Sequence, residues 1–192
     1  MKKTIAILLV LAVVMTGAFA AASTVTLKST VAEGSFFGVS KTAKGATVTA
    51  PTALPAQSPW EADTGAANTI EGAFDDAKTV YFGYITNKSY AGAVTASVVA
   101  KPFVLQKDGA DLAGATENQK VGYAITGTAA KVTAATVATS DASKDVTVAF
   151  DFAGAGVRGE EVSLTFAATQ ADVAKAASGD YVATVTFNIA SI

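Results

Sequence analysis

The sequence predicts an all-β fold: an immunoglobulin-like, antiparallel β-sandwich with Greek-key connections and one short helical turn near the C-terminus. Three observations predict it. Residues 181–189 alternate apolar and polar side chains, which is typical of a strand with one buried face. Shorter runs of the same kind recur along the chain between turn residues. Only residues 170–177 have a helical pattern, with Asp172 early and Lys175 late, where each charge suits the helix dipole.

The first twenty residues have the three parts of a secretory signal peptide. Two lysines near the N-terminus are followed by the apolar run 5–15 and by the small-residue site Ala18-Phe19-Ala20, with Ala20-Ala21-Ala22 as a second choice. A membrane-spanning helix needs about 20 apolar residues, so we expect no membrane span in the mature protein. The prediction is export to the periplasm, cell surface or extracellular space, with residues 1–20 removed and residues 21–192 forming one domain.

The C-terminal run has one apolar face and one polar face. The apolar face carries Tyr181, Ala183, Val185, Phe187 and Ile189, and the other carries Val182, Thr184, Thr186 and Asn188. A tyrosine here, after a helical turn and Gly179-Asp180, resembles the tyrosine corner of immunoglobulin-like sandwiches. We therefore expect the Tyr181 hydroxyl to donate a hydrogen bond to an upstream backbone carbonyl and to fix the corner.

The other strands are predicted from the same alternation and from the turns between them. In chain order they cover residues 24–31, 35–39, 46–50, 79–86, 91–100, 103–105, 121–126, 132–139, 146–152 and 162–168. Turns are predicted at Glu33-Gly34 and at Asp108-Gly109. A short polar connection joins residues 79–86 to 91–100, which predicts a hairpin. The proline-rich stretch 51–68 is predicted to be a loop.

Charge and composition argue against several classes of partner and site. Without the two lysines of the signal peptide, 12 basic side chains stand against 16 acidic ones, and the formal net charge becomes −4 in place of −2. This mild acidity and a single arginine, Arg158, argue against nucleic acid or an anionic membrane as a partner. The chain has no cysteine and no histidine, so it lacks thiolate nucleophiles, the commonest general base and the commonest zinc ligand.

The acidic side chains form no clear catalytic or metal-binding set. Asp75-Asp76 and Glu160-Glu161 are sequence neighbours, whereas glycoside hydrolysis needs two carboxylates held apart across a cleft. We interpret both pairs as solvated turn residues. The stretch 108–111 resembles a fragment of a calcium loop but lacks the remaining ligands, so a hairpin turn is expected there. The prediction is a protein without catalytic activity, cofactor or bound metal.

Three aromatic residues support an alternative function. Trp60 lies in the predicted loop, and Tyr81 and Tyr90 are predicted in or near the central hairpin. Exposed aromatic rings can stack on sugars, so these three are candidate ligand-binding residues of a carbohydrate-binding module. In the interpretation that we favour, Trp60 folds back to cap the end of the sandwich, because tryptophan is highly buried on average.

The C-terminal run also carries a resemblance to a known family. Gly179-Asp180-Tyr181-Val182-Ala183-Thr184-Val185-Thr186-Phe187 is similar to the closing strand of bacterial fimbrial subunits and spore-coat-U-like secreted proteins, which often reads G-x-Y-x-A/D-x-V-x-F/V. Residues 33–38 echo their first strand. The cysteine pair common in that family is missing here. The resemblance implies an incomplete immunoglobulin-like sandwich that is completed by a strand from a neighbouring subunit.

Residues 23–31 are the candidate donor of such a strand. Val25, Leu27 and Val31 share one face and would be its apolar plugs. The alternative is that this segment pairs within its own domain as an edge strand, because consecutive strands usually pair locally. The sequence therefore predicts an exported, non-catalytic structural or cell-surface protein of a fimbrial or adhesive kind. Its partners would be other copies or related subunits, and glycans under the alternative function.

Overall fold

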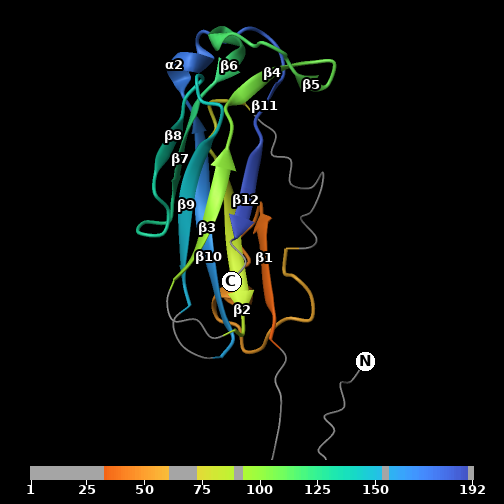
Figure 1. The fold of residues 1–192 in the computed structure, drawn as a ribbon, viewed down its shortest axis with the longest axis vertical. Helices are drawn as coiled ribbons and strands as arrows, with labels where there is room; N and C mark the ends of the chain where they lie inside the picture. The colour runs from red at the N-terminus through yellow and green to blue at the C-terminus, as the bar shows by residue number, and fades with distance from the viewer. Residues whose placement is uncertain (1–32, 61–72, 89–92, 153–155, 190–192) are drawn as a thin grey trace, which may run out of the picture. The chain divides into compact units, whose positions relative to one another are not determined.

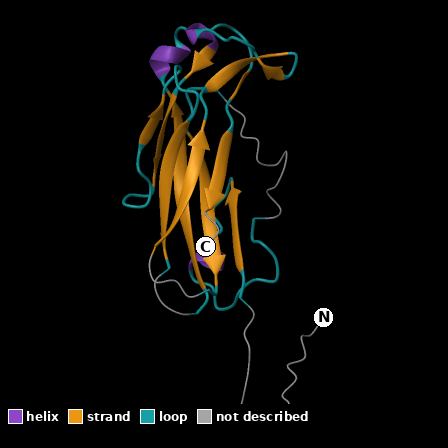
Figure 2. Cartoon of the chain, viewed as in Figure 1, coloured by secondary structure: helices purple, strands orange, loops and turns teal. Residues whose placement is uncertain are grey.

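Antiparallel β-strands are the predominant secondary structure, as the sequence predicts. The computed structural model describes residues 33–60, 73–88, 93–152 and 156–189. Two sheets face each other in these residues, and the short helices lie outside them (Figures 1 and 2). The predicted signal peptide, the candidate donor segment and Tyr90 lie outside the described residues.

The larger sheet has five strands in the order β1-β2-β10-β7-β8. They are β1 (Ser35–Ser40), β2 (Lys78–Thr86), β10 (Arg158–Ala168), β7 (Tyr123–Gly127) and β8 (Ala135–Val137). All neighbouring pairs are antiparallel. The central strand, β10, pairs with β2 from Arg158 opposite Thr86 to Phe166 opposite Lys78. This long ladder makes β2 and β10 the frame on which the edge strand β1 depends.

The smaller sheet has three strands in the order β12-β3-β9, again antiparallel. They are β12 (Val185–Ile189), β3 (Ala93–Ala100) and β9 (Lys144–Asp151). The predicted hairpin between residues 79–86 and 91–100 is therefore wrong, because β2 and β3 belong to different sheets. Their apolar faces meet across the core. A short polar connection serves a hairpin and a crossing between sheets equally well, so its length could not separate the two.

The core lies between the two sheets and is rich in aromatic rings. Phe82 of β2 contacts two rings of the opposite sheet: its centroid is 5.4 Å from that of Phe150 on β9 and 5.0 Å from that of Phe187 on β12. Phe150 is completely buried. Burying one such side chain contributes about 1.5–3 kcal/mol, so these contacts hold the sheets face to face.

A small sheet lies beyond one end of the two large ones. It contains β4 (Phe103–Lys107), β5 (Ala110–Asp111), β6 (Lys120–Val121) and β11 (Tyr181–Val182), next to the 3-10 helix η3 (Glu117–Gln119) and to α2 (Gln170–Val173). We call this group the cap. The predicted turn at Asp108-Gly109 is confirmed: φ is 55° and 79° at these two residues, as a type I′ hairpin turn requires.

The Tyr181 hydroxyl makes the kind of hydrogen bond that the sequence predicts. It donates to the Ala177 carbonyl at 2.9 Å, four residues upstream. The predicted helical segment is shorter than expected, because α2 ends at Val173 and only turns follow it. The predicted C-terminal strand is divided into β11 and β12, although the Lys101 N–H donates to the Thr184 carbonyl at 3.1 Å and so links the two ladders.

Two further predictions are wrong on the outer face of the larger sheet. Residues 46–50, predicted as a strand, contain the helix α1 (Ala46–Thr49), which follows Gly45 at a φ of 55°. Glu160 and Glu161 are strand residues of β10 and not solvated turn residues. The Glu161 carboxylate accepts hydrogen bonds from the Lys44 and Gly45 N–H groups, which fixes the approach to α1. The pattern could not reveal this because the acceptor is far away in sequence.

Gly34 is tied to the end of β2 just before β1 begins. Its N–H donates to Asn87 Oδ1 at 2.7 Å, and its carbonyl accepts from the Asn87 N–H at 3.2 Å. Residues 1–32 lie outside the described residues, so the turn at Glu33-Gly34 stays a prediction.

Candidate functional site: the open side of the sandwich

One side of the sandwich is closed by backbone hydrogen bonds between the two sheets. Residues 131–133, which lead into β8 of the larger sheet, pair with β9 of the smaller one. The Thr133 N–H donates to the Thr147 carbonyl at 3.3 Å, and the Ala149 N–H donates to the Lys131 carbonyl at 2.9 Å. Val132 and Val148 form an antiparallel bridge between these bonds. We call this side the closed side.

The strand orders place β1 and β12 at the opposite side, each at the edge of its own sheet. Within the described residues, β1 pairs only with β2, β12 pairs only with β3, and no backbone hydrogen bond joins β1 to β12. Among the described residues, each strand therefore has one edge whose backbone N–H and C=O groups have no strand partner. We call this side, bounded by β1 and β12, the open side.

Apolar side chains of the core faces line the open side. They are Phe37 and Val39 from β1, and Val185, Phe187 and Ile189 from β12; these two sets share a face with residues that pack on the core. Phe37 is 52% exposed, and the others are half-buried. On β9, beside the closed side, the corresponding residues Val148 and Phe150 are completely buried. The open side therefore leaves uncovered apolar surface that the closed side covers.

This arrangement has the chemistry that binds an extended peptide. Free edge groups supply main-chain hydrogen bonds, and apolar side chains between the sheets receive alternate side chains of an added strand. A free, uncharged edge is also a risk of aggregation that proteins normally blunt with charge or proline. Neither charge nor proline occurs in β1 or β12. The open side is therefore the candidate functional site.

The structure does not present Trp60 as a ligand-binding ring. Trp60 is only 2% exposed and packs on Gly38 and Gly83, on the outer face of the larger sheet. Trp60 is buried, as the favoured interpretation expects. However, it covers a face of the sandwich, whereas that interpretation placed it over the end. Tyr81 is half-buried, and Tyr90 lies outside the described residues. The three candidate aromatics therefore form no exposed platform in the described structure.

The structure describes the residues that line the open side but not the proposed plugs. Val25, Leu27 and Val31 lie outside the described residues. The sequence pattern shows Phe187 on the apolar face of the last strand, where the structure places it. Phe37 and Val39 were predicted as strand residues without a role. Only the strand order reveals that β1 is an edge beside β12, so alternation alone could not assign them to a site.

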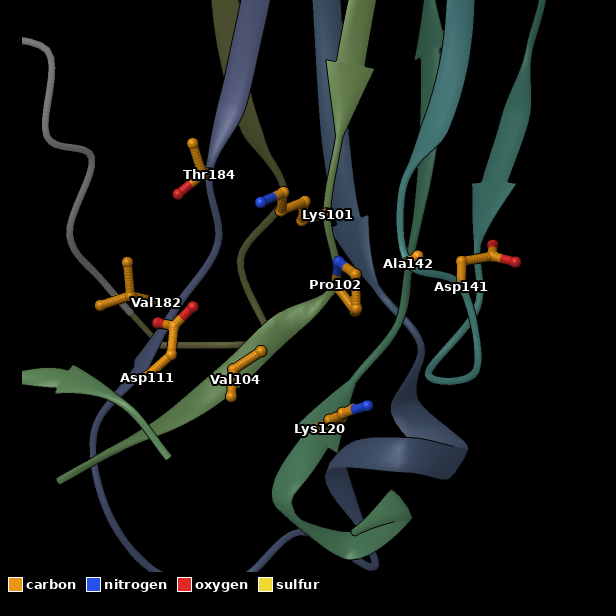
Figure 3. A pocket seen from close by; sticks show the side chains of 9 residues that line it. All are labelled: Lys101, Pro102, Val104, Asp111, Lys120, Asp141, Ala142, Val182 and Thr184. Atoms are coloured by element: carbon orange, nitrogen blue, oxygen red, sulfur yellow. The ribbon is translucent and has the colours of Figure 1, made fainter. Parts of the chain in front are cut away.

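Two small hollows lie at the cap among the described residues. Figure 3 shows the first, of about 160 Å³, which is lined by Lys101, Pro102, Val104, Asp111, Lys120, Asp141, Ala142, Val182 and Thr184. The ammonium groups of Lys101 and Lys120 point in different directions there. The second, of about 180 Å³, is lined by Glu117, Asn118, Thr139, Asp172 and Lys175. No metal-binding cluster occurs among the described side chains.

Tyr123, at the cap end of the core, is a buried titratable group with a structural role. Its hydroxyl donates to the Lys101 carbonyl at 2.8 Å. Burial raises the pKa of Tyr123 well above its ordinary value, because the buried phenolate would lose its hydration. The hydroxyl is therefore neutral at physiological pH and links β7 to the joint between β3 and β4.

A search for membrane-spanning helices and comparisons with known proteins add two findings. In the described part, no helix has the length and apolar character needed to cross a membrane. The chain matches no protein-family model, and neither a curated protein nor a solved structure is significantly similar to it.

Proposed function

We propose that this protein is an exported, non-catalytic structural or cell-surface subunit, of a fimbrial or adhesive kind, that assembles by strand addition at its open side. The observation that carries the proposal is the contrast between the two sides. Backbone bonds from residues 131–133 close one side, whereas β1 and β12 leave unpaired edges on the other. An added strand would pair with an edge and cover Phe37 and Phe187.

The strand order supports an immunoglobulin-like assignment. In such sandwiches, strands A, B, E and D form one sheet and strands C, F and G form the other. We assign β1, β2, β10 and β7 to the first set, and β3 and β12 to C and F. The place of G is then the free edge of β12. The strand β9 departs from this scheme, because it lies beside β3 but follows β8 in the chain.

The Tyr181 hydrogen bond supports the same assignment. A tyrosine corner belongs near the start of strand F, with its hydroxyl on backbone a few residues upstream. Tyr181 begins β11, which leads into β12, and donates to Ala177. This corner would hold the start of the strand whose edge stays free.

We propose residues 23–31 of a second copy as the added strand. With Val25, Leu27 and Val31 facing the core, this segment supplies plugs at alternate positions. A second copy is the proposed source of the strand because the family resemblance implies completion by a neighbouring subunit.

Export and the lack of catalysis rest on the composition. The N-terminal twenty residues have the form of a signal peptide. A chain without histidine or cysteine lacks the commonest general base and any thiolate nucleophile. N-terminal sequencing of protein recovered from the periplasm or the medium tests the export, and a mature N-terminus at residue 21 is the expected result.

Disulfide trapping between copies tests the strand addition. The chain has no cysteine, so two introduced cysteines report on a single pair without background. Thr26 would face outward when its neighbours Val25 and Leu27 face inward, and Thr186 is an exposed residue of β12. A Thr26→Cys protein mixed with a Thr186→Cys protein should form a disulfide-linked heterodimer under mild oxidation.

The matched control is Thr26→Cys mixed with Thr147→Cys, since Thr147 is equally exposed on the same sheet but lies on β9, next to the closed side. Deleting residues 23–31 should also convert the assembled protein to a monomer in size-exclusion chromatography. Equal trapping at Thr147 and Thr186, or two equally stable monomers with and without residues 23–31, would show that strand addition does not occur.

A further inference from the structure

Residues 41–60 cross the outer face of the larger sheet and connect its centre to its edge. We call them the strap. At the centre, Lys44 N–H donates to the Glu161 carboxylate of β10 at 2.9 Å, and the Val48 side chain is completely buried. At the edge, Leu54 lies against Gly34 and Trp60 lies across β1 and β2. The strap therefore spans three strands.

Two glycines form the seat of Trp60. Gly38 of β1 and Gly83 of β2 are directly opposite each other in the ladder. A Cβ atom at Gly38 would lie 2.5 Å from Trp60 Cβ, and one at Gly83 would lie 2.2 Å from Trp60 Cζ2. Both distances are well inside van der Waals contact. The indole fits only because both positions lack a side chain, so it presses the edge strand and its neighbour from outside.

The seat has one unfavourable feature. The Trp60 indole nitrogen is buried and has no hydrogen-bond partner. Buried donors are almost always paired, because an unpaired one has lost its bond to water without replacement. If the indole leaves the seat, its N–H can again donate a hydrogen bond to water. The apolar contacts and the unpaired N–H therefore act in opposite directions on the same side chain.

The strap acts on the strand that forms one wall of the open side. β1 has a single ladder partner, β2, in the described structure. Its outer face carries Gly38 under the indole and Phe36, which packs in the same outer cluster. Its other face carries Phe37 and Val39, which line the open side. Movement of β1 would therefore change the open side directly.

We propose that the strap is a latch on β1. With Trp60 seated, β1 stays in the ladder with β2; with Trp60 released, β1 loosens and the open side widens. The proposal that the strap holds β1 in place depends only on the contacts of the strap. The consequence for assembly rests on the proposed function, because it needs a strand to enter between β1 and β12.

The test displaces the indole without deleting it. Gly83→Ala places a methyl group where the Trp60 ring lies, and Trp60 is the single tryptophan of the chain, so its fluorescence reports the seat directly. We expect a red-shifted emission with several-fold greater acrylamide quenching. Amide hydrogen exchange of β1 should become at least about tenfold faster, whereas the amides of β3 and β9 keep their rates. Thr147→Ala, an exposed position on the other sheet, is the control and should change neither signal.

A displaced indole with unchanged exchange in β1 would overturn the proposal. If Gly83→Ala does not fold, native-state hydrogen exchange of the unaltered protein gives the answer. The Lys44 and Gly45 amides, which the Glu161 carboxylate protects, should then open together with β1 at the same denaturant dependence. Independent opening would also overturn it.

The experiments distinguish a failure of strand addition from a failure of the latch. In that case the disulfide trapping at Thr186 is negative, while the fluorescence and exchange of the monomer still follow the latch. If the latch holds and strands are added, Gly83→Ala should change the rate of trapping between Thr26→Cys and Thr186→Cys. An unchanged trapping rate with a released indole would show that the latch does not control assembly.

Discussion

The two sides of the sandwich differ in how the backbone groups at the sheet edges are paired. At the closed side, residues 131–133 leave the larger sheet and bond to Thr147 and Ala149 of β9, so this part of the β9 edge is paired within the described chain. At the open side, β1 and β12 end the two sheets without such a bridge among the described residues. A paired edge is closed to other chains, whereas the edges of β1 and β12 are where we propose that another strand is added.

The difference extends to the side chains behind each edge. Phe150, next to the closed side, is completely buried, whereas Phe187, next to the open side, is only half-buried, although both rings contact Phe82. If strands are added at the open side as we propose, stability and recognition are separated in space. The following variants test that separation, beginning with the largest expected effect.

Truncating a ring on each side should have unequal effects on stability. Phe150→Ala removes a buried ring with three aromatic neighbours and should lower the free energy of unfolding by about 3–5 kcal/mol. Phe187→Ala removes a half-buried ring and should lower it by about 1–2 kcal/mol in the unassembled protein. Urea unfolding followed by circular dichroism measures both. Equal losses would contradict the distinction between the sides.

Opening the closed side should weaken the fold and create a second reactive edge. Thr133→Pro removes the N–H that bonds to the Thr147 carbonyl and should lower the free energy of unfolding by about 1–2 kcal/mol. Light scattering at increasing concentration should then detect more association than in the unaltered protein, because β9 gains an additional free edge. Thr126→Ala, an exposed residue of β7, is the control. A stable, non-aggregating Thr133→Pro protein would show that the bridge is dispensable.

Tyr123 gives a pH-dependent test one strand away from the closed side. Burial raises the pKa of its hydroxyl in the folded state, so its contribution to stability is complete below the unfolded-state pKa of about 10 and is lost as the pH rises above that value. Tyr123→Phe should cost about 1 kcal/mol at pH 7 through the lost bond to Lys101. Urea unfolding at pH 7 and at pH 11 should show this deficit shrink. A constant deficit would show that the buried hydroxyl does not titrate with unfolding.

The smallest effect on stability should come with a complete effect on assembly. Phe37→Lys replaces a side chain that is 52% exposed, so the free energy of unfolding should change by less than about 0.5 kcal/mol. A lysine facing the open side repels an incoming apolar strand. The disulfide trapping at Thr186 should therefore disappear. Persistent trapping in a folded Phe37→Lys protein would show that β1 does not line the binding site.

The sequence predicts the strands better than their neighbours. Alternation located β2, β3, β9, β10 and β12 because each has one face in a common core. It did not show that β2 and β3 lie in different sheets, since both arrangements bury the same apolar faces. The hydrogen bond of Tyr181 was predictable because its donor and acceptor are only four residues apart.

The candidate site was less predictable than the fold. An edge is a property of sheet order, and sheet order depends on pairings such as β2 with β10 that join distant parts of the chain. The strap was missed for a similar reason. Nothing near Lys44 in the sequence indicates that Glu161 accepts its N–H, and Val48 looked like a strand residue because its alternation with threonine suits a strand as well as a short helix on an apolar face.

The placing of β2 and β3 in opposite sheets also fixes the order in which the chain can complete its fold. β2 needs β10, which begins at Arg158, and β3 needs β9 and β12, which begin at Lys144 and Val185. Within the two large sheets, a chain that emerges from the ribosome with its N-terminus first can pair only β1 with β2 until β8 (Ala135–Val137) has been made. Such long-range pairing delays folding. For the export that we propose, this delay would keep the chain unfolded, and so competent for translocation, until it has crossed the membrane.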